Sequence, residues 1–298
     1  MSQTYKDNAI TKAELEAIRD KYRQQRYNEC LREVKLKLKQ SPNSLHLLNY
    51  QAMAYSALKK DKEALSVYQK IIKKDSSLAG PYYNMGIILR RNERVEEAID
   101  HYKKAISLKP DYVQAFNNLG VLYKDSEKYE DAIKMFTKAT QLQPDHQNSY
   151  YNLALIKKEQ GLYEEAIELV LKVLDLNPDH GEAKLYAKRV CNDVGIKLHN
   201  DGKYEAALKY FQIFSLLEPK EHSGFYNIGN CYLELKDFQN AKTNYKMALK
   251  FEPKNEQIQA NLGEVYRNIG KIEKALKCYN KAIKINPDNP NNLYNMAV

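Results

Sequence analysis

Proline and apolar helical runs recur in this chain with a period of 34 residues. The prolines at 110, 144 and 178 are 34 residues apart, as are those at 219, 253 and 287, and Ser76 stands where one proline of the first series is missing. A repeat of this length is typical of two-helix units, each of which can bury its apolar face only against a stacked neighbour. The sequence therefore predicts an all-α solenoid of antiparallel helix pairs.

Eight full repeats and a partial ninth account for residues 11–298, after an N-terminal tail at 1–10. The repeats are 11–44, 45–78, 79–112, 113–146, 147–180, 188–221, 222–255 and 256–289, and the partial repeat is 290–298. Seven additional residues, 181–187, separate the fifth and sixth repeats. Because 182–199 contains no proline and one glycine, they are expected to lengthen a helix. A longer loop without a role is the alternative.

Small residues mark the places where helices are expected to pack closely. Position 20 of the repeat is alanine in seven repeats and Cys30 in the first, and position 8 is mostly glycine: Gly86, Gly120, Gly195, Gly229 and Gly263. Aromatic side chains such as Phe136 should fill the space beside them. In the first helix, positions 4, 7, 8 and 11 share one arc, which predicts that positions 2, 5, 6, 9, 12 and 13 face away from the core.

This combination of small residues at positions 8, 20 and 27, aromatic residues at 11 and 17, and proline at 32 resembles the tetratricopeptide repeat family over residues 11–298. The resemblance implies a right-handed superhelix with the first helices lining its concave side. The first two repeats depart from the pattern, because Lys21, Lys37 and Gln51 occupy usually apolar positions. The first repeat is therefore expected to act as a polar cap.

The same resemblance implies where a ligand would bind. Position 6 carries Asn84, Asn118, Asn152, Asn227 and Asn261, with Asp193 in the sixth repeat, and position 9 carries Met53, Ile87, Val121, Leu155 and Ile196. A ladder of amides suits the backbone of an extended peptide, as in the arm of O-GlcNAc transferase, and the apolar stripe would receive its side chains. The alternatives are asparagines that bridge neighbouring helices and apolar residues that pack against the next repeat.

The last residues, 291–298 (NNLYNMAV), have the pattern of another first helix that then stops. Without that helix, Ala275, Tyr279 and Ala282 are expected to form an exposed apolar edge. Such an edge would be covered by further chain, by a partner or by self-association.

Composition narrows the function classes. The net charge of +9 comes from basic residues spread along the helices, which favours solvated faces over a nucleic-acid-binding stripe. Four widely spaced cysteines, a polar N-terminus and the lack of a spanning apolar run predict a cytoplasmic or nucleocytoplasmic protein that is neither secreted nor membrane-bound. No catalytic, phosphate-binding or metal-binding motif is present, so neither enzyme activity nor a cofactor is expected.

We therefore predict a non-enzymatic interaction scaffold that binds an extended protein or peptide segment within a larger complex. A second hypothesis comes from residues 117–125 (NNLGVLYKD), and more loosely from 182–204. These resemble the arms of Spindly-type O-fucosyltransferases and of their O-GlcNAc transferase relatives. On that hypothesis the chain is the substrate-recognition arm of a protein O-glycosyltransferase whose catalytic region lies outside it.

Overall fold

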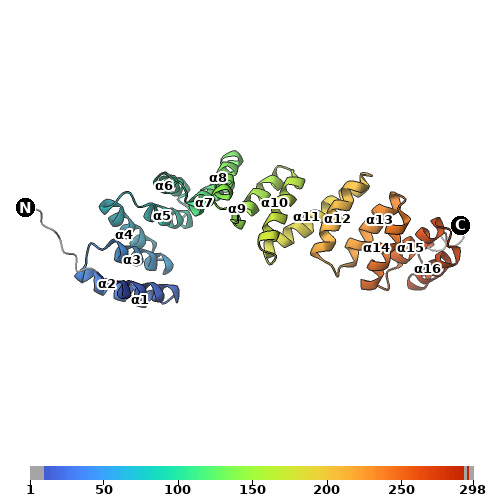
Figure 1. The fold of residues 1–298 in the computed structure, drawn as a ribbon, viewed down its shortest axis with the longest axis horizontal. Helices are drawn as coiled ribbons and strands as arrows, with labels where there is room; N and C mark the ends of the chain where they lie inside the picture. The colour runs from blue at the N-terminus through green and yellow to red at the C-terminus, as the bar shows by residue number, and fades with distance from the viewer. Residues whose placement is uncertain (1–9, 292–293, 295–298) are drawn as a thin grey trace, which may run out of the picture. The chain divides into compact units, whose positions relative to one another are not determined.

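The computed structural model describes residues 10–291 and 294, and this part of the chain is all-helical. Its helices, coloured in chain order in Figure 1, are α1 (Lys12–Arg23), α2 (Tyr27–Gln40), α3 (Leu45–Ala57), α4 (Asp61–Lys74), α5 (Ala79–Arg91), α6 (Val95–Leu108), α7 (Val113–Asp125), α8 (Tyr129–Leu142), α9 (Gln147–Glu159), α10 (Tyr163–Leu176), α11 (Gly181–Asn200), α12 (Tyr204–Leu217), α13 (His222–Glu234), α14 (Phe238–Phe251), α15 (Glu256–Asn268) and α16 (Ile272–Ile285). Successive helices pack as pairs. The prediction of an all-α fold of paired helices is confirmed.

The chain divides into two compact units, residues 1–152 and 153–298, and the division falls within α9. Among the described helices, none combines the length and the apolar composition needed to cross a bilayer.

Helix pairs close through contact between a glycine of the first helix and an aromatic ring of the second. A Cβ atom added to Gly120 would lie 2.7 Å from Cε1 of Phe136, and one added to Gly263 would lie 2.6 Å from Cε1 of Tyr279. Gly86, Gly195 and Gly229 meet Tyr102, Phe211 and Tyr245 in the same way. Because these rings are buried on all sides, they cannot move aside to admit a methyl group.

Two pairs use alanine at the glycine position. In the fifth repeat the corresponding residues are Ala154 and Val170, both fully buried, so a smaller side chain on the second helix accompanies the larger one on the first. In the second repeat Ala52 corresponds to a tyrosine, Tyr68, and both are buried. These two pairs therefore accommodate a Cβ atom at the position that is glycine in five other repeats.

First helices bury a second stripe that the arc of positions 4, 7, 8 and 11 did not include. Position 10 is buried in six repeats, as Ala54, Ile88, Leu122, Ile156, Cys231 and Val265. A first helix inside the stack is covered by its own second helix on one side and by the preceding repeat on another. It therefore needs two apolar stripes, and the single arc predicted from the sequence was incomplete.

The turn inside each repeat requires one residue with a left-handed backbone. Position 15 has φ between 58° and 75° in all eight repeats, and it is glycine only at 161, 202 and 270. In the other five repeats it is Gln25, Lys59, Glu93, Glu127 and Lys236. A side chain in this region costs about 1–3 kcal/mol, so the two flanking helices must hold these turns in place.

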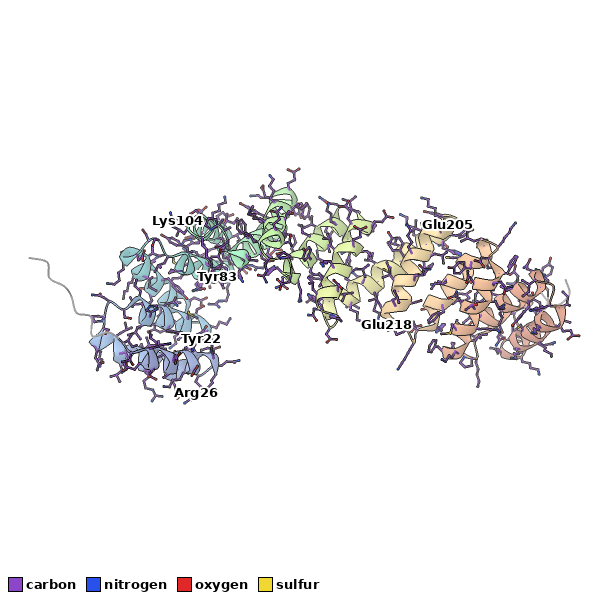
Figure 2. The ribbon with its side chains drawn as sticks, in the orientation of Figure 1. Tyr22, Arg26, Tyr83, Lys104, Glu205 and Glu218 are labelled. Atoms are coloured by element: carbon purple, nitrogen blue, oxygen red, sulfur yellow. The ribbon has the colours of Figure 1, made fainter. Side chains whose placement is uncertain are left out.

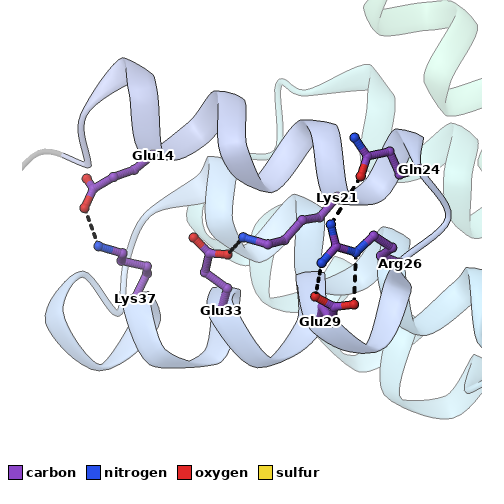
Figure 3. A network of polar contacts seen from close by, with 7 residues as sticks. All are labelled: Glu14, Lys21, Gln24, Arg26, Glu29, Glu33 and Lys37. Atoms are coloured by element: carbon purple, nitrogen blue, oxygen red, sulfur yellow. Dashed lines mark hydrogen bonds and ion pairs between the residues drawn. The ribbon is translucent and has the colours of Figure 1, made fainter.

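Polar contacts join α1 and α2 where later repeats pack apolar side chains. Lys21 pairs with Glu33, and Lys37 pairs with Glu14 across the two helices, as Figure 3 shows. Glu14 also completes a capping box, accepting from the backbone N–H of Thr11 at 2.8 Å. The lysines at usually apolar positions thus have carboxylate partners on the facing helix.

α11 is 20 residues long and contains the seven additional residues 181–187. His180 precedes it and accepts a hydrogen bond from the backbone N–H of Ala183 at 3.3 Å. The added turns carry their own buried stripe, formed by Ala183, Tyr186 and Ala187. The additional residues therefore contribute packing surface as well as length.

The apolar edge expected near the C-terminus is not exposed at the residues named for it. Ala275 and Tyr279 are each 2% exposed and Ala282 is fully buried. That expectation was wrong because a second helix packs this stripe against its own first helix, with the Tyr279 ring on Gly263. The large apolar side chains that α16 does expose are Ile272, Leu276 and Ile285. Residues 292–293 and 295–298 of the partial repeat, like 1–9 of the tail, lie outside the described residues.

The close contact in each pair predicts the effect of added methyl groups. We expect Gly120→Ala to destabilise the protein by about 1–3 kcal/mol through overpacking against Phe136. Gly80→Ala is the matched control, because nothing lies within 4 Å of its added Cβ. The double variant Gly120→Ala/Phe136→Val copies the pair of the fifth repeat and should lose less stability than the two single variants summed. Chemical denaturation measures all four, and equal effects at Gly80 and Gly120 would contradict the account.

The Lys37–Glu14 pair predicts a pH dependence of the first repeat. Hydrogen bonds from Lys37 and then from Thr11 lower the pKa of Glu14 from 4.5 to about 2. Because the folded pKa lies below the unfolded one, the stabilisation is complete above about pH 4.5 and is lost as the pH falls towards 2. The carboxyl ¹³C shift of Glu14 should titrate near pH 2, and Lys37→Ala should raise that midpoint whereas Lys39→Ala should not. A midpoint near 4.5 in the unmodified protein would contradict the ion pair.

Candidate functional site

The predicted binding residues lie on the first helices of seven repeats, and we call positions 6 and 9 of these helices the first-helix face. The five asparagines at position 6 are all half-buried. Asp193 and Ile196, on α11, are exposed, whereas Met53, Ile87, Val121 and Leu155 are half-buried. Their side chains differ in what they contact, and those contacts decide which of them remain available to a ligand.

Asn261 is bound within the fold. Its Nδ2 atom donates to Oδ1 of Asn230 at 3.0 Å and lies 3.4 Å from the hydroxyl of Tyr245, and that hydroxyl donates to the same Oδ1 at 2.8 Å. Burial raises the pKa of Tyr245 far above its ordinary value, and Asn261 offsets part of the rise. This amide therefore bridges two repeats and satisfies a buried phenol.

Asn84 and Asn118 also lie beside tyrosine hydroxyls. Burial raises the pKa of Tyr68 well above its usual value, and Asn84, which lies beside its hydroxyl, offsets part of that rise. Asn118 donates to Oη of Tyr83 at 3.2 Å. It also lies beside the hydroxyl of Tyr102. Burial raises the pKa of Tyr102 to about 12, and Asn118 offsets part of that rise. The Tyr102 hydroxyl itself has no partner within full hydrogen-bond geometry.

A simple pattern separates these asparagines from the other two. Position 24 of the preceding repeat is tyrosine before Asn84, Asn118 and Asn261, and it is phenylalanine before Asn152 and Asn227. The phenylalanines are Phe136 and Phe211. Their rings pack against the position-8 glycine, as the tyrosine rings do, and we call this space the glycine notch, but they carry no hydroxyl. A tyrosine at position 24 therefore places a hydroxyl beside the next asparagine, and a phenylalanine does not. Asn261 donates to such a hydroxyl on Tyr245, whereas Asn118 donates to Tyr83, which is at position 5.

Asn152 and Asn227 keep hydrogen-bonding capacity. Asn152 donates to the backbone oxygen of Asn148 at 2.9 Å, and its carbonyl oxygen and second N–H have no further partner among the described residues. In the part of the chain that the structure describes, Asn227 forms no side-chain hydrogen bond. An amide offers one acceptor and two donors, so these two positions can still bind a peptide backbone.

A buried polar chain in the first compact unit was not predicted from the sequence. His146 lies 2.9 Å from Oγ of Ser149, which donates to Oδ1 of Asn117 at 3.1 Å, and Asn117 donates to Asn118 at 3.4 Å. Asn118 then donates to Tyr83, which Figure 2 labels on α5. Burial lowers the pKa of His146. A polar residue at buried position 3, such as Ser149, was the signal that could have revealed this chain.

The apolar stripe at position 9 is divided between packing and exposure. Met53 and Ile87 pack against the core of the first unit, and Met53 also accepts a contact from Asn49 at 3.3 Å. Ile196 is 42% exposed. Part of the stripe therefore packs in the core, which is the alternative that the sequence pattern left open for position 9. Its exposed residue, Ile196, is on α11.

The cysteines of the described chain are buried thiols of low reactivity. All four cysteines are unpaired and buried, and burial raises the pKa of Cys191 and Cys231 to about 12. These thiols stay protonated at neutral pH and lack the thiolate that a nucleophile requires. The polar side chains predicted to bind at position 6 of the first-helix face are five amides and the carboxylate of Asp193, which can hydrogen-bond to a ligand.

Comparisons with known proteins agree with this repeat architecture. A profile described as TPR repeat matches residues 86–126, and profiles described as tetratricopeptide repeat match 50–77, 123–189, 222–255 and 257–289. No curated protein matches the chain.

Several solved structures are similar in fold. A structure described as the MamA RS-1 ArsTM double mutant has a TM-score of 0.50 and 21% identity, over 58% of this chain and 99% of that one. A MamA crystal structure has 0.49 and 24%, over 55% and 95%. A tetratricopeptide repeat protein from Parabacteroides merdae ATCC 43184 has 0.47 and 16%, over 85% and 97%. At these identities the likeness concerns the fold alone.

The profile matches fall in both compact units, and three of them contain a glycine–aromatic contact: Gly86–Tyr102, Gly229–Tyr245 and Gly263–Tyr279. The chain belongs to the tetratricopeptide repeat family.

Proposed function

We propose that this protein is a non-enzymatic interaction scaffold that binds an extended protein or peptide segment along its first-helix face. Stacked helical repeats present long continuous surfaces and commonly use them for binding. An extended segment has unpaired backbone N–H and C=O groups, which need partners when they leave water. Amide side chains spaced one per repeat can supply such partners.

The observation that carries this proposal is that Asn152 and Asn227 have side-chain hydrogen-bonding groups that the described part of the fold does not use. Asn118 and Asn261 donate to tyrosine hydroxyls and Asn84 lies beside one, so a ladder that uses every repeat equally is not what we propose. Asn152 belongs to the first compact unit and Asn227 to the second. Each unit thus has its own amide, and each has apolar neighbours at position 9, Val121 in the first and Ile196 in the second.

Apolar and polar contacts have separate roles in this proposal. Half-buried residues such as Val121 and Leu155, and the exposed Ile196, offer apolar area to ligand side chains. Burying that area supplies affinity, roughly 25 cal/mol per Å² before the costs of association. The amides fix the position and direction of the bound backbone, because an unmatched polar group in the interface is costly.

The test uses peptides selected on the intact chain. A library of random peptides is enriched on the immobilised protein, and affinities of enriched peptides are measured by fluorescence anisotropy. We expect Asn152→Ala/Asn227→Ala to weaken binding roughly tenfold, the effect of about two lost hydrogen bonds. The melting temperature should stay within a few degrees, because neither amide bonds a buried group.

The matched control is Asn244→Ala/Asn280→Ala, which removes two amides from second helices. Asn244, like Asn152, donates to a backbone oxygen four residues earlier. Equal affinity loss in both double variants, or none in either, would contradict the proposal. Failure to enrich any peptide on the unmodified chain would contradict it as well.

A further inference from the structure

An open cavity of about 490 Å³ lies where α9, α10 and α11 meet, and we call it the α11 cavity. It is lined by Lys158 of α9, Tyr163 of α10, and Arg189, Val190, Asp193, Val194 and Lys197 of α11. All of these residues belong to the unit 153–298. Asp193 is the position-6 residue of the sixth repeat, so the cavity includes part of the first-helix face.

The α11 cavity arises from a departure at position 10 of the sixth repeat. In the second to fifth, seventh and eighth repeats this position is buried against the stack, whereas Lys197 is exposed. The added turns of α11 supply a substitute, because Ala183 and Ala187 are fully buried near its N-terminus. α11 therefore packs through its added turns as well as through Cys191 and Gly195 further along the helix, whereas Val194 is only half-buried.

Positive charge dominates the lining. Lys158, Arg189 and Lys197 face a single carboxylate, Asp193. Within the described residues, neither Arg189 nor Lys197 forms an ion pair, and Lys158 pairs only with its chain neighbour Glu159, at 3.2 Å. Elsewhere on α11, Lys188 pairs with Glu218 at 2.8 Å. The cations of the cavity thus remain available to an anionic ligand.

Apolar surface lies beside these charges. Val194 is the half-buried apolar residue that α11 contributes, since Val190 is only 6% exposed, and Tyr163 is 42% exposed at the start of α10. A ligand that satisfies both features must carry a negative charge next to an apolar group. An acidic residue beside an apolar one in a peptide has this chemistry.

We propose that the α11 cavity is an acid-binding subsite of the peptide-binding surface. The carboxylate of an Asp or Glu side chain in the bound peptide lies between Arg189 and Lys197. The neighbouring apolar side chain of the peptide rests on Val194 beside Tyr163. Asp193, on the same face of α11, limits the positive charge to a level suited to one carboxylate. This inference rests on the proposed function and specifies the class of peptide it takes.

The test compares peptide selections on variants of the full chain. Peptides enriched on the unmodified protein should carry Asp or Glu next to an apolar residue at one fixed position. Arg189→Ala/Lys197→Ala should lose that preference and should bind the enriched peptides roughly tenfold more weakly, as expected for two partly exposed ion pairs. Lys184→Ala/Lys203→Ala removes two exposed cations outside the cavity and should retain both the preference and the affinity.

Three outcomes would overturn the inference. If the acidic preference is missing, or persists in Arg189→Ala/Lys197→Ala, peptides still bind but the cavity is not an acid subsite, and the proposed function stands. If no peptide is enriched at all, the proposed function fails together with this inference. If single-stranded oligo(dT) binds through Arg189 and Lys197 with a steep salt dependence, the cavity takes a phosphate backbone instead.

Discussion

The close approach of glycine to an aromatic ring in five of the helix pairs is the constraint on which this structure depends. At Gly86, Gly120, Gly195, Gly229 and Gly263 there is no room for a Cβ atom, because the ring of the second helix already occupies that volume. Each pair is therefore a fixed unit with its own interior. Stacking then requires only that the outer stripes of neighbouring pairs match.

The same aromatic position connects packing to binding. A tyrosine there places a buried hydroxyl beside the asparagine of the next repeat, and Asn261 donates to that of Tyr245. Among the described residues the hydroxyl of Tyr102 has no hydrogen-bond partner. A phenylalanine fills the notch equally well and brings no hydroxyl. Core composition thus decides which polar groups of the first-helix face are committed to stability and which remain for a ligand.

Much of the fold could be predicted from the sequence because the same pattern recurs along the chain, so that an atypical residue in one repeat does not change the assignment. Seven prolines, five glycines and the recurrent alanines all specify the same helix pair, so no single residue had to carry the prediction. The stripe at position 10 was missed because a helical wheel shows one helix in isolation. The expected exposure of Tyr279 was wrong for a related reason: its cover is its own first helix, Gly263 included, and a period alone does not say which neighbour buries which stripe.

The candidate site was less predictable. Position 6 stood out as a row of asparagines, but the alternatives of ladder and bridge could not be separated without knowing which hydroxyls lie within reach. The α11 cavity could not be predicted from the sequence, because nothing there distinguishes Lys197 from the other solvent-exposed lysines. The exposure of Lys197 depends on the added turns of α11, because the buried residues Ala183 and Ala187 of those turns replace the packing that position 10 provides in other repeats.

One substitution pair isolates the role of the aromatic hydroxyl. Phe136→Tyr and Phe211→Tyr place a hydroxyl where other repeats already accommodate one, opposite Asn152 and Asn227, without adding bulk at the glycine notch. Peptide affinity measured by fluorescence anisotropy should fall towards that of the double asparagine variant, while helicity and melting temperature are retained. Unchanged affinity in a folded double tyrosine variant would show that the buried rings do not control the binding face.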